Sequence, residues 1–178
     1  MRPARPLPYD LRADAVIADD KATITFASHG TVGAVFHVTS SGAPRDYTVG
    51  ARQSITGSWP APVGQGIRVH GPNGFYRQFA GTGPDITAAP SGASVRLTAT
   101  NNSSAAVRLT LTSAYGGERS HLTVPPHSTV PFTVPTALGT GWYDLSVTSS
   151  ANPEYLRRLA GHVETGQPGV SDPALGRS

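Results

Sequence analysis

The sequence contains no cysteine, a single lysine (Lys21) and few charged residues of any kind. The absence of cysteine excludes disulfide bonds, thiolate chemistry and cysteine-ligated metal. Charged residues make up 14% of the chain, against about 25% in typical soluble domains. The arginines are scattered and the net charge is only +3, so we expect no nucleic-acid partner. No apolar run reaches the roughly 18 residues of a membrane-spanning helix, and we expect no transmembrane segment.

Glycine and proline are abundant, with 20 and 16 residues, which indicates many turns and few long helices. The first residues, Met1–Pro8, lack the apolar stretch of a signal peptide, and their prolines favour an extended chain. We predict that residues 1–9 are a linker from an upstream domain. Residues 167–178 are also rich in glycine, proline and serine, and we predict an extended or frayed tail there.

Short runs in which apolar and polar residues alternate occur throughout the chain. A period of two places apolar side chains on one face of a strand and polar side chains on the other. The apolar members of these runs are Ile24 and Phe26; Ala34, Phe36 and Val38; Val95, Leu97 and Ala99; Val107, Leu109 and Leu111; and Leu145 and Val147. Turn-forming clusters separate the runs, so the pattern predicts an all-β fold of the sandwich kind.

The two halves of the chain resemble each other. Phe75–Gly81 and Tyr155–Gly161 share one order of residue types: aromatic, bulky, Arg, polar, large apolar, Ala, Gly. The earlier runs line up in the same order, Ile24 and Phe26 with Val95 and Leu97, then Phe36 and Val38 with Val107 and Leu109. We predict two tandem small immunoglobulin-like β-sandwiches, at residues 10–82 and 83–166, of about six or seven short strands each. The alternative is one sandwich to which each copy contributes one sheet.

The repeated arginines, Arg77 and Arg157, are the clearest polar signal. Each stands between large apolar residues that share its face of a strand. A buried guanidinium must find partners, because an unpaired buried charge is costly. We therefore expect structural arginines that bind carbonyl groups at a sheet end or between the two units. The alternative is that they reach a lipid phosphate.

Three aromatic residues, Trp59, Trp142 and Tyr143, are candidates for surface or lipid contact. They stand at predicted strand ends, beside Pro60 and Gly141. Rings at loop tips stack on sugars or enter a lipid interface. The alternative is that they cap the cores of the sandwiches. Tyr143 would then hydrogen-bond back to the backbone, as in a tyrosine corner.

No group of residues predicts catalysis, a cofactor or a metal. The six histidines lack the spacing that places two imidazoles on one helical face; they are His29, His37, His70, His121, His127 and His162. His37 is a candidate to face His70 or His121 across strands. Asp14, Asp19 and Asp20 form the only local acidic cluster, to which Asp46 or Asp85 could add, and we expect a solvated turn rather than a calcium site.

Three segments resemble a known family: Leu7–Leu11, Gly71–Gly81 and Leu159–Gly166. They are similar to the C-terminal domain repeats of phosphocholine-preferring bacterial phospholipases C, enzymes of the alkaline-phosphatase-like superfamily. In that family a large catalytic domain precedes two copies of this small domain. The resemblance covers the chain from Leu7 to Gly166. It implies a secreted parent enzyme, exported by the twin-arginine route, whose nucleophile and metal ligands lie outside this chain.

The resemblance implies a non-catalytic accessory module that packs on the upstream catalytic domain and contacts a phospholipid surface. Two other functions stay open. One is a carbohydrate- or cell-surface-binding module that uses Trp59 or Trp142. The other is a structural spacer.

Overall fold

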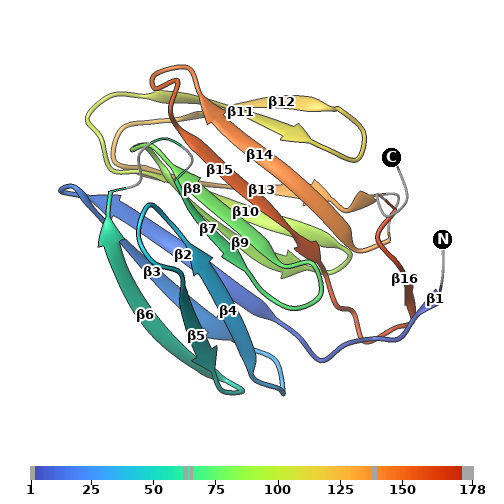
Figure 1. Ribbon diagram of the computed structural model, residues 1–178. Helices are drawn as coiled ribbons and strands as arrows, with labels where there is room; N and C mark the ends of the chain where they lie inside the picture. Colours follow the sequence, from blue (N-terminus) through green and yellow to red (C-terminus); the bar gives the residue numbers. More distant parts are fainter. Residues whose placement is uncertain (1–2, 62–63, 65, 138–139, 174–178) are drawn as a thin grey trace.

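The computed structural model describes residues 3–61, 64, 66–137 and 140–173, and the regular elements that lie in these ranges are all β-strands. Figure 1 shows one broad sheet in front of two smaller ones. The prediction of an all-β fold is confirmed. In the part of the chain that is described, no helix has the length and apolar character to cross a membrane.

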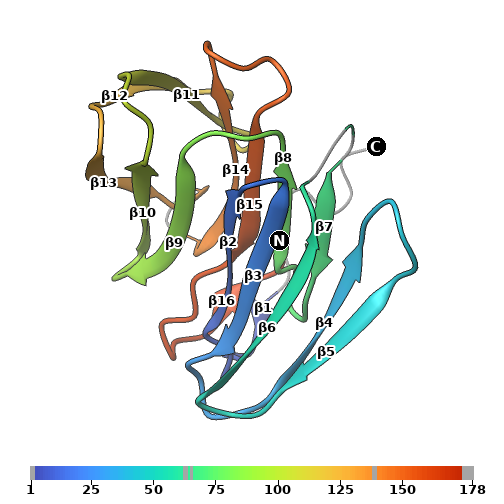
Figure 2. The same ribbon diagram turned by 90° about the vertical axis from the view of Figure 1, so that its left-hand side faces the viewer.

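The first repeat contains seven strands in two layers. The strands are β2 (Leu11–Ala18), β3 (Lys21–Ser28), β4 (Ala34–Thr39), β5 (Arg45–Val49), β6 (Gln53–Pro60), β7 (Ile67–His70) and β8 (Tyr76–Ala80). One layer is a three-stranded sheet in the order β2-β3-β6, and the other contains β5-β4-β7-β8. Figure 2 shows the three-stranded layer lying against β4, β5 and β7.

The second repeat has the same seven strands in the same order. They are β9 (Asp85–Ser91), β10 (Ser94–Asn101), β11 (Val107–Ser113), β12 (Arg119–Val124), β13 (Ser128–Pro135), β14 (Trp142–Ser149) and β15 (Leu156–His162). Its layers are β9-β10-β13 and β12-β11-β14-β15. Each repeat contributes to both layers and has its own buried apolar cluster, so the alternative of one sheet from each copy is wrong.

The final strands of the two repeats pair with each other. β8 and β15 are antiparallel, with Arg77 opposite Leu159 and Arg157 opposite Phe79. Gln78 and Arg158 face each other at the centre, so this register reads the same from either repeat. The pairing fuses the two larger layers into one eight-stranded sheet, β12-β11-β14-β15-β8-β7-β4-β5. The two repeats are thus related by a local pseudo-twofold axis through this strand pair.

The alternating residues predicted from the sequence form the two cores. Ile24, Phe26, Phe36 and Leu97 are fully buried, and the other apolar members of the runs are buried as well. In the first repeat an aromatic cluster closes the sandwich, with Tyr47 stacked on Phe26 at a centroid distance of 4.6 Å. Aromatic and aliphatic burial of this kind is the main stabilising contribution to a sandwich.

The ladders also define which residues of the two repeats correspond. In the first repeat, Arg77 is paired with Val69 on the next strand, and Val69 is paired with Val38. In the second repeat, Arg157 is paired in the same way with Val147, and Val147 with Leu111. Val38 therefore corresponds to Leu111 and not to Leu109, so the expected alignment is wrong by two residues there. A shift of two leaves every side chain on the same face, and alternation alone does not reveal it.

The two ends of the chain pair with each other. Short strands β1 (Pro3–Ala4) and β16 (Gly169–Val170) form an antiparallel ladder, at the side of the molecule where both termini lie in Figure 1. Within the predicted linker and tail, Pro3–Ala4 and Gly169–Val170 are therefore extended and joined to one another rather than frayed. Residues 1–2 and 174–178 of these segments lie outside the described ranges.

Candidate functional site

Two buried arginines lie at the centre of the molecule. Arg77 and Arg157 are each 1% exposed, although they belong to the least readily buried residue types. They occupy β8 and β15, the strands through which the repeats pair. Both guanidinium groups are therefore placed at the boundary between the two sandwiches.

The arginines bind the repeats to each other reciprocally. Nη1 of Arg77 donates a hydrogen bond to the carbonyl of Ala160, at 2.9 Å. Nη1 of Arg157 donates to the carbonyls of Ala80 and Gly81, at 2.6 and 3.2 Å. Ala80 and Ala160 are equivalent positions, so the same contact is made twice in opposite directions. Each arginine also donates to the carbonyl of the residue before it, at 2.8 and 3.0 Å.

The two arginine sites differ in one contact. Each guanidinium lies over the aromatic ring two residues before it, 4.2 Å from the centre of Phe75 and 4.3 Å from that of Tyr155. Nη2 of Arg77 also donates to the hydroxyl of Tyr143, at 3.0 Å. Nη2 of Arg157 makes no such bond within the described protein. Burial lowers the pKa of Arg157, and the neighbouring Tyr155 and Asp85 oppose that change.

A pair of aspartates repeats the reciprocal arrangement in the other layer, where β2 lies beside β9. The carboxylate of Asp14 is hydrogen-bonded by the backbone of Ala88, and that of Asp85 by the backbone of Ile17. Burial raises the pKa of both carboxyl groups, while Arg77 acts to lower the pKa of Asp14 and Arg157 that of Asp85. Each repeat therefore places one carboxylate and one guanidinium at the shared boundary.

These raised pKa values predict a pH dependence of stability. The folded protein binds protons to Asp14 and Asp85 more tightly than the unfolded chain does. Their contribution to the free energy of unfolding is therefore fully present below about pH 4 and is lost as the pH rises through the raised pKa values. The double variant Asp14→Asn/Asp85→Asn, which keeps the acceptor oxygens, should gain stability relative to the native chain as the pH rises from about 4 to about 7.

Chemical denaturation across that pH range measures the effect. Asp46→Asn is the matched control, because Asp46 is exposed, with 63% of its side chain accessible, and bonds only to His37. Equal pH profiles for the native chain and the double variant would contradict the assignment of these two carboxyl groups.

A second polar centre lies where the chain enters the first repeat. Oε1 of Glu164 accepts hydrogen bonds from Nδ2 of Asn73, at 2.7 Å, and from Nδ1 of His162, at 2.9 Å. Oε2 accepts from the backbone N–H of Leu7, at 3.0 Å. The side chains of His162 and Glu164 are only 11% and 9% exposed. Glu164 thus joins all three segments on which the family resemblance was based.

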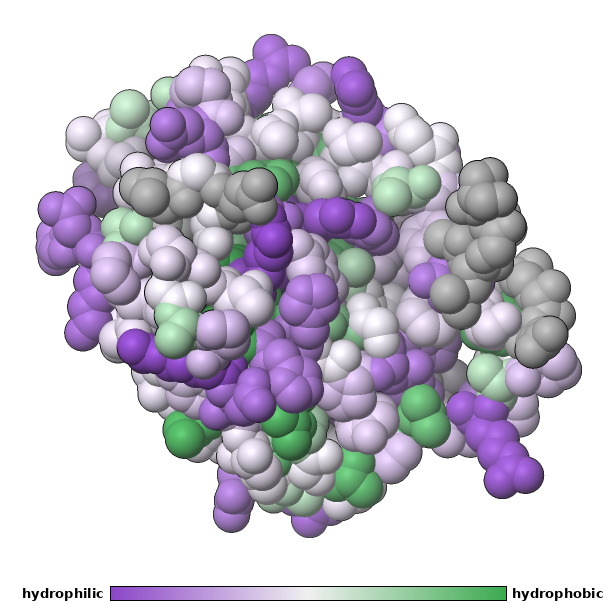
Figure 3. Space-filling model, viewed as in Figure 1, coloured by the Kyte–Doolittle hydropathy of each residue, from purple (hydrophilic) through white to green (hydrophobic). Residues whose placement is uncertain are grey.

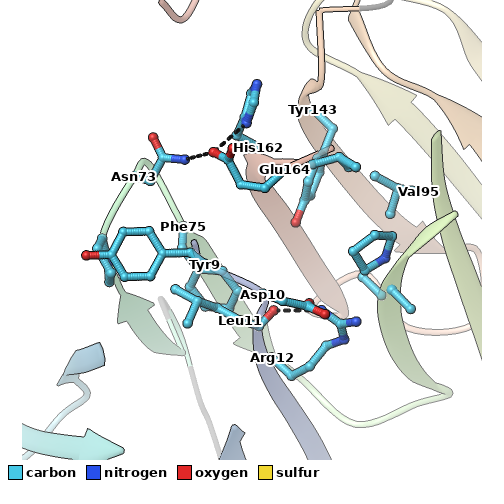
Figure 4. Close-up of a pocket in the computed structure, with 15 residues that line it drawn as sticks. Tyr9, Asp10, Leu11, Arg12, Asn73, Phe75, Val95, Tyr143, His162 and Glu164 are labelled. Atoms are coloured by element: carbon cyan, nitrogen blue, oxygen red, sulfur yellow. Dashed lines mark hydrogen bonds and ion pairs between the residues drawn. The ribbon is translucent and has the colours of Figure 1, made fainter. Parts of the chain in front are cut away.

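A cavity of about 130 Å³ adjoins this centre. Figure 4 shows Asn73, His162 and Glu164 on one side of it and the contact between Arg12 and Asp10 on the other. Both repeats line the cavity, through residues such as Phe75 and Tyr143. Its polar atoms are largely engaged with one another, which indicates a structural junction rather than a reaction centre.

The three aromatic candidates lie inside the protein rather than on its surface. Trp59, Trp142 and Tyr143 are 5%, 9% and 8% exposed. Trp59 packs in the aromatic cluster of the first repeat, and Nε1 of Trp142 donates to the carbonyl of Val170, at 2.8 Å. This burial counts against lipid contact through these rings. The tyrosine that bonds to the backbone is Tyr155, whose hydroxyl donates to the carbonyl of Pro84 at 2.8 Å.

The burial of both tryptophans predicts their fluorescence. Emission should be shifted to the blue, and acrylamide should quench it weakly, because the quencher reaches only exposed rings. Unfolding in guanidinium provides the reference for full exposure. Red-shifted emission that is strongly quenched in the native chain would contradict the positions of Trp59 and Trp142.

The histidines and the acidic cluster form no metal-binding group. Within the described ranges, no three ligand-type side chains lie close enough together to hold an ion. His37 faces His70 across strands, as the sequence suggested, and bonds to Asp46 at 2.7 Å. Asp19 and Asp20 form the β2–β3 hairpin turn with φ values of 50° and 57°, as a primed two-residue turn requires.

Comparison with known proteins identifies the family. The profile of the family described as "Bacterial phospholipase C, C-terminal domain" matches residues 3–82 and 85–162. The two matches coincide with the two sandwiches. The chain belongs to the bacterial phospholipase C C-terminal domain family.

Full-length phospholipases C contain a similar segment. The chain is 37% identical over 201 aligned residues to the non-hemolytic phospholipase C of Burkholderia pseudomallei, covering 98% of this chain and 28% of that protein. It is 34% identical to the non-hemolytic phospholipase C of Pseudomonas aeruginosa, covering 99% of the chain and 29% of the relative. It is 32% identical to the hemolytic phospholipase C of the same species, over 98% of the chain and 30% of the relative.

The chain thus spans less than a third of the length of these phospholipases C. Because the family match is to the C-terminal domain, the catalytic domain of the longer proteins is absent from this chain. The resemblance found in the sequence is confirmed.

Two features of the site were missed in the sequence. Asp14 and Asp85 were considered only as calcium ligands, although they lie on equivalent strands, β2 and β9, and stand 71 positions apart, close to the spacing of the other matched runs. Glu164 was not assigned a role, although it lies in a segment that carried the resemblance. Its bonds to Asn73 and Leu7 are long-range, and no local pattern predicts them.

Proposed function

We propose that this chain is the accessory C-terminal module of a secreted phospholipase C, and that it packs on the catalytic domain of the same polypeptide and shapes access to the lipid surface. The observation that supports packing is the anchoring of the incoming chain. Pro3 and Ala4 pair with β16, and Leu7 bonds to Glu164. A segment fixed in this way leaves little freedom between the module and whatever precedes it.

The anchored end also offers a surface to a preceding domain. The Asn73–Gly74 turn, the end of β15 and the β1–β16 ladder all meet there. Asn73 has a φ of 55° and Gly74 one of 70°, so the turn keeps a single tight shape. We propose this end as the contact with the catalytic domain.

Hydrogen exchange tests the packing. The exchange of backbone amides should be compared between the isolated chain and a polypeptide that also carries the preceding domain. Amides around Asn73 and Glu164 should become more protected in the longer protein, while those of the β14–β15 hairpin, at the opposite end of β15, should not change. Identical exchange at both places would contradict packing at this end.

Two further assays test the rest of the proposal. The isolated chain should release no phosphocholine from phosphatidylcholine, with or without divalent metal, and substantial release would contradict an accessory role.

The longer protein should be recovered from the culture medium of its producing cell. Retention in the cytoplasm would contradict secretion.

A further inference from the structure

A shallow depression, the basin, lies beside the point where the chain enters the first repeat. It has a volume of about 540 Å³, and the residues that line it include Tyr9, Val35, Val49 and Pro72. None of the described residues in its lining is acidic, and none is lysine or arginine. Figure 3 shows hydrophobic residues along the lower side of the molecule, where β4 begins and β5 ends in Figure 1. The basin therefore presents an uncharged and largely apolar surface.

The basin adjoins the polar centre around Glu164. Tyr9 and Pro72 line both the basin and the cavity next to Glu164. The backbone N–H of His29 donates to the carbonyl of Asp10, at 2.7 Å, which fixes the entering chain beside the loop that leads into β4. The entering chain is thus held along one rim of the basin.

Val35 is the most exposed large apolar side chain in the lining of the basin. It lies on the outer face of β4, and 39% of its surface is accessible. Leu7, on the entering chain, is 38% exposed. Single exposed apolar side chains are ordinary on a protein surface, so exposure by itself does not identify a contact.

The second repeat carries a different side chain at the place of Val35. Because Val38 corresponds to Leu111, Val35 corresponds to Arg108, and each is paired with a threonine on the neighbouring edge strand. Arg108 is exposed. A charged residue therefore fits this position of the fold, and the first repeat has valine there.

The loop before the last strand differs between the repeats in the same sense. The segment Gly71–Gly74 of the first repeat corresponds to Ala151–Glu154 of the second, so Gly74 stands at the place of the exposed Glu154. This end of the sandwich is charged in the second repeat and uncharged in the first. The antiparallel pairing of β8 with β15 places the two equivalent ends on opposite sides of the molecule.

We infer that the basin is an apolar contact with the domain that precedes this chain in the longer polypeptide. The family match is to a C-terminal domain, and the longer relatives extend well beyond the matched segment. The preceding domain is then connected to the module through the chain that lies along the rim of the basin. An uncharged depression gains most from a partner that is itself apolar, because both surfaces lose water. The preceding domain should therefore present aliphatic or aromatic side chains here.

The inference rests on the proposed packing of the module, and it names a face and a chemistry for that packing. Single cysteines test it, since the chain itself has none. Val35→Cys should react with a maleimide at least about tenfold more slowly in the polypeptide that also carries the preceding domain than in the isolated chain. Arg108→Cys, at the equivalent position of the second repeat, should react at rates within about twofold of each other in the two proteins. Mass spectrometry of the labelled peptide separates these thiols from any in the preceding domain.

A second variant tests the apolar character of the contact. Val35→Arg introduces the side chain that the second repeat carries at this position, so the isolated variant should unfold at the same urea concentration as the native chain. In the longer polypeptide it should reduce the protection of amides around Asn73 from exchange by at least about fivefold, because a charge would be buried without a partner. Val16→Arg is the control, since Val16 is 55% exposed on β2, in the other layer, and it should leave the protection unchanged.

The outcomes separate the basin from the packing itself. Protection around Asn73 without slower labelling at position 35, or unchanged protection in Val35→Arg, would overturn the basin and leave the packing intact. Absence of protection at both places would overturn both. Labelling of Val35→Cys that slows in the isolated chain as its concentration rises would assign the basin to a second copy. Labelling that slows with phosphatidylcholine vesicles alone would assign it to lipid, and either result would overturn the inference.

Discussion

Replacing Arg157 with alanine should lower the free energy of unfolding by about 3–5 kcal/mol. The substitution leaves the carbonyls of Ala80 and Gly81 buried without the donor they share. It also removes the group stacked on Tyr155 and creates a cavity between the repeats. Because the lost contacts join both sandwiches, both should become less stable together. Urea denaturation followed by circular dichroism measures the change.

The adjacent arginine provides a matched control for this experiment. Arg158 bonds to Asp144 through two nitrogens, at 2.9 and 2.7 Å, but its side chain is 44% exposed. Arg158→Ala should cost less than about 1 kcal/mol, as exposed ion pairs contribute little. Arg157→Met separates the two effects, because methionine restores packing without the hydrogen bonds. A loss for Arg157→Ala no larger than that for Arg158→Ala would contradict the role of the buried guanidinium.

Replacing Glu164 with alanine should release the incoming chain. Three donors lose their acceptor, on Asn73, His162 and Leu7, and the free energy of unfolding should fall by about 2–3 kcal/mol. The amides of Ala4 and Leu7 should exchange at least about tenfold faster, because the local structure there opens without global unfolding. Mass-spectrometric hydrogen exchange resolves this segment from the rest of the chain.

Glu154 is the control for the Glu164 experiment, since it lies exposed in the loop before β15. Glu154→Ala should change stability by less than about 0.5 kcal/mol. Glu164→Gln should fall between the native chain and Glu164→Ala, because the amide retains one acceptor oxygen. Unchanged exchange at Leu7 in Glu164→Ala would show that the carboxylate does not anchor the chain.

The strands and the internal repeat could be predicted from the sequence. Alternation identified Ile24, Phe36 and Leu97 as core residues, because a strand with one buried face has no other way to distribute its apolar side chains. The matched endings around Arg77 and Arg157 identified the repeat, because equivalent strands meet equivalent surroundings.

The association of the repeats could not be predicted in the same way. Alternation indicates which side chains of a strand are buried, but it does not indicate which strand lies next to it. The sequence therefore did not predict the pairing of β8 with β15. The reciprocal bonds of Asp14 and Asp85 depend on that pairing and were missed with it. Trp59 and Trp142 were ambiguous for a related reason, because a ring at a strand end is buried or exposed according to what packs on it.

The central claim is that two copies of one fold associate through β8 and β15 about a pseudo-twofold axis. Nuclear Overhauser contacts between the backbones of these strands, in the isotopically labelled chain, test it most directly. We predict contacts between Arg77 and Leu159 and between Phe79 and Arg157, with Gln78 opposite Arg158. Absence of these contacts, or a register that is not symmetric about Gln78 and Arg158, would contradict the account.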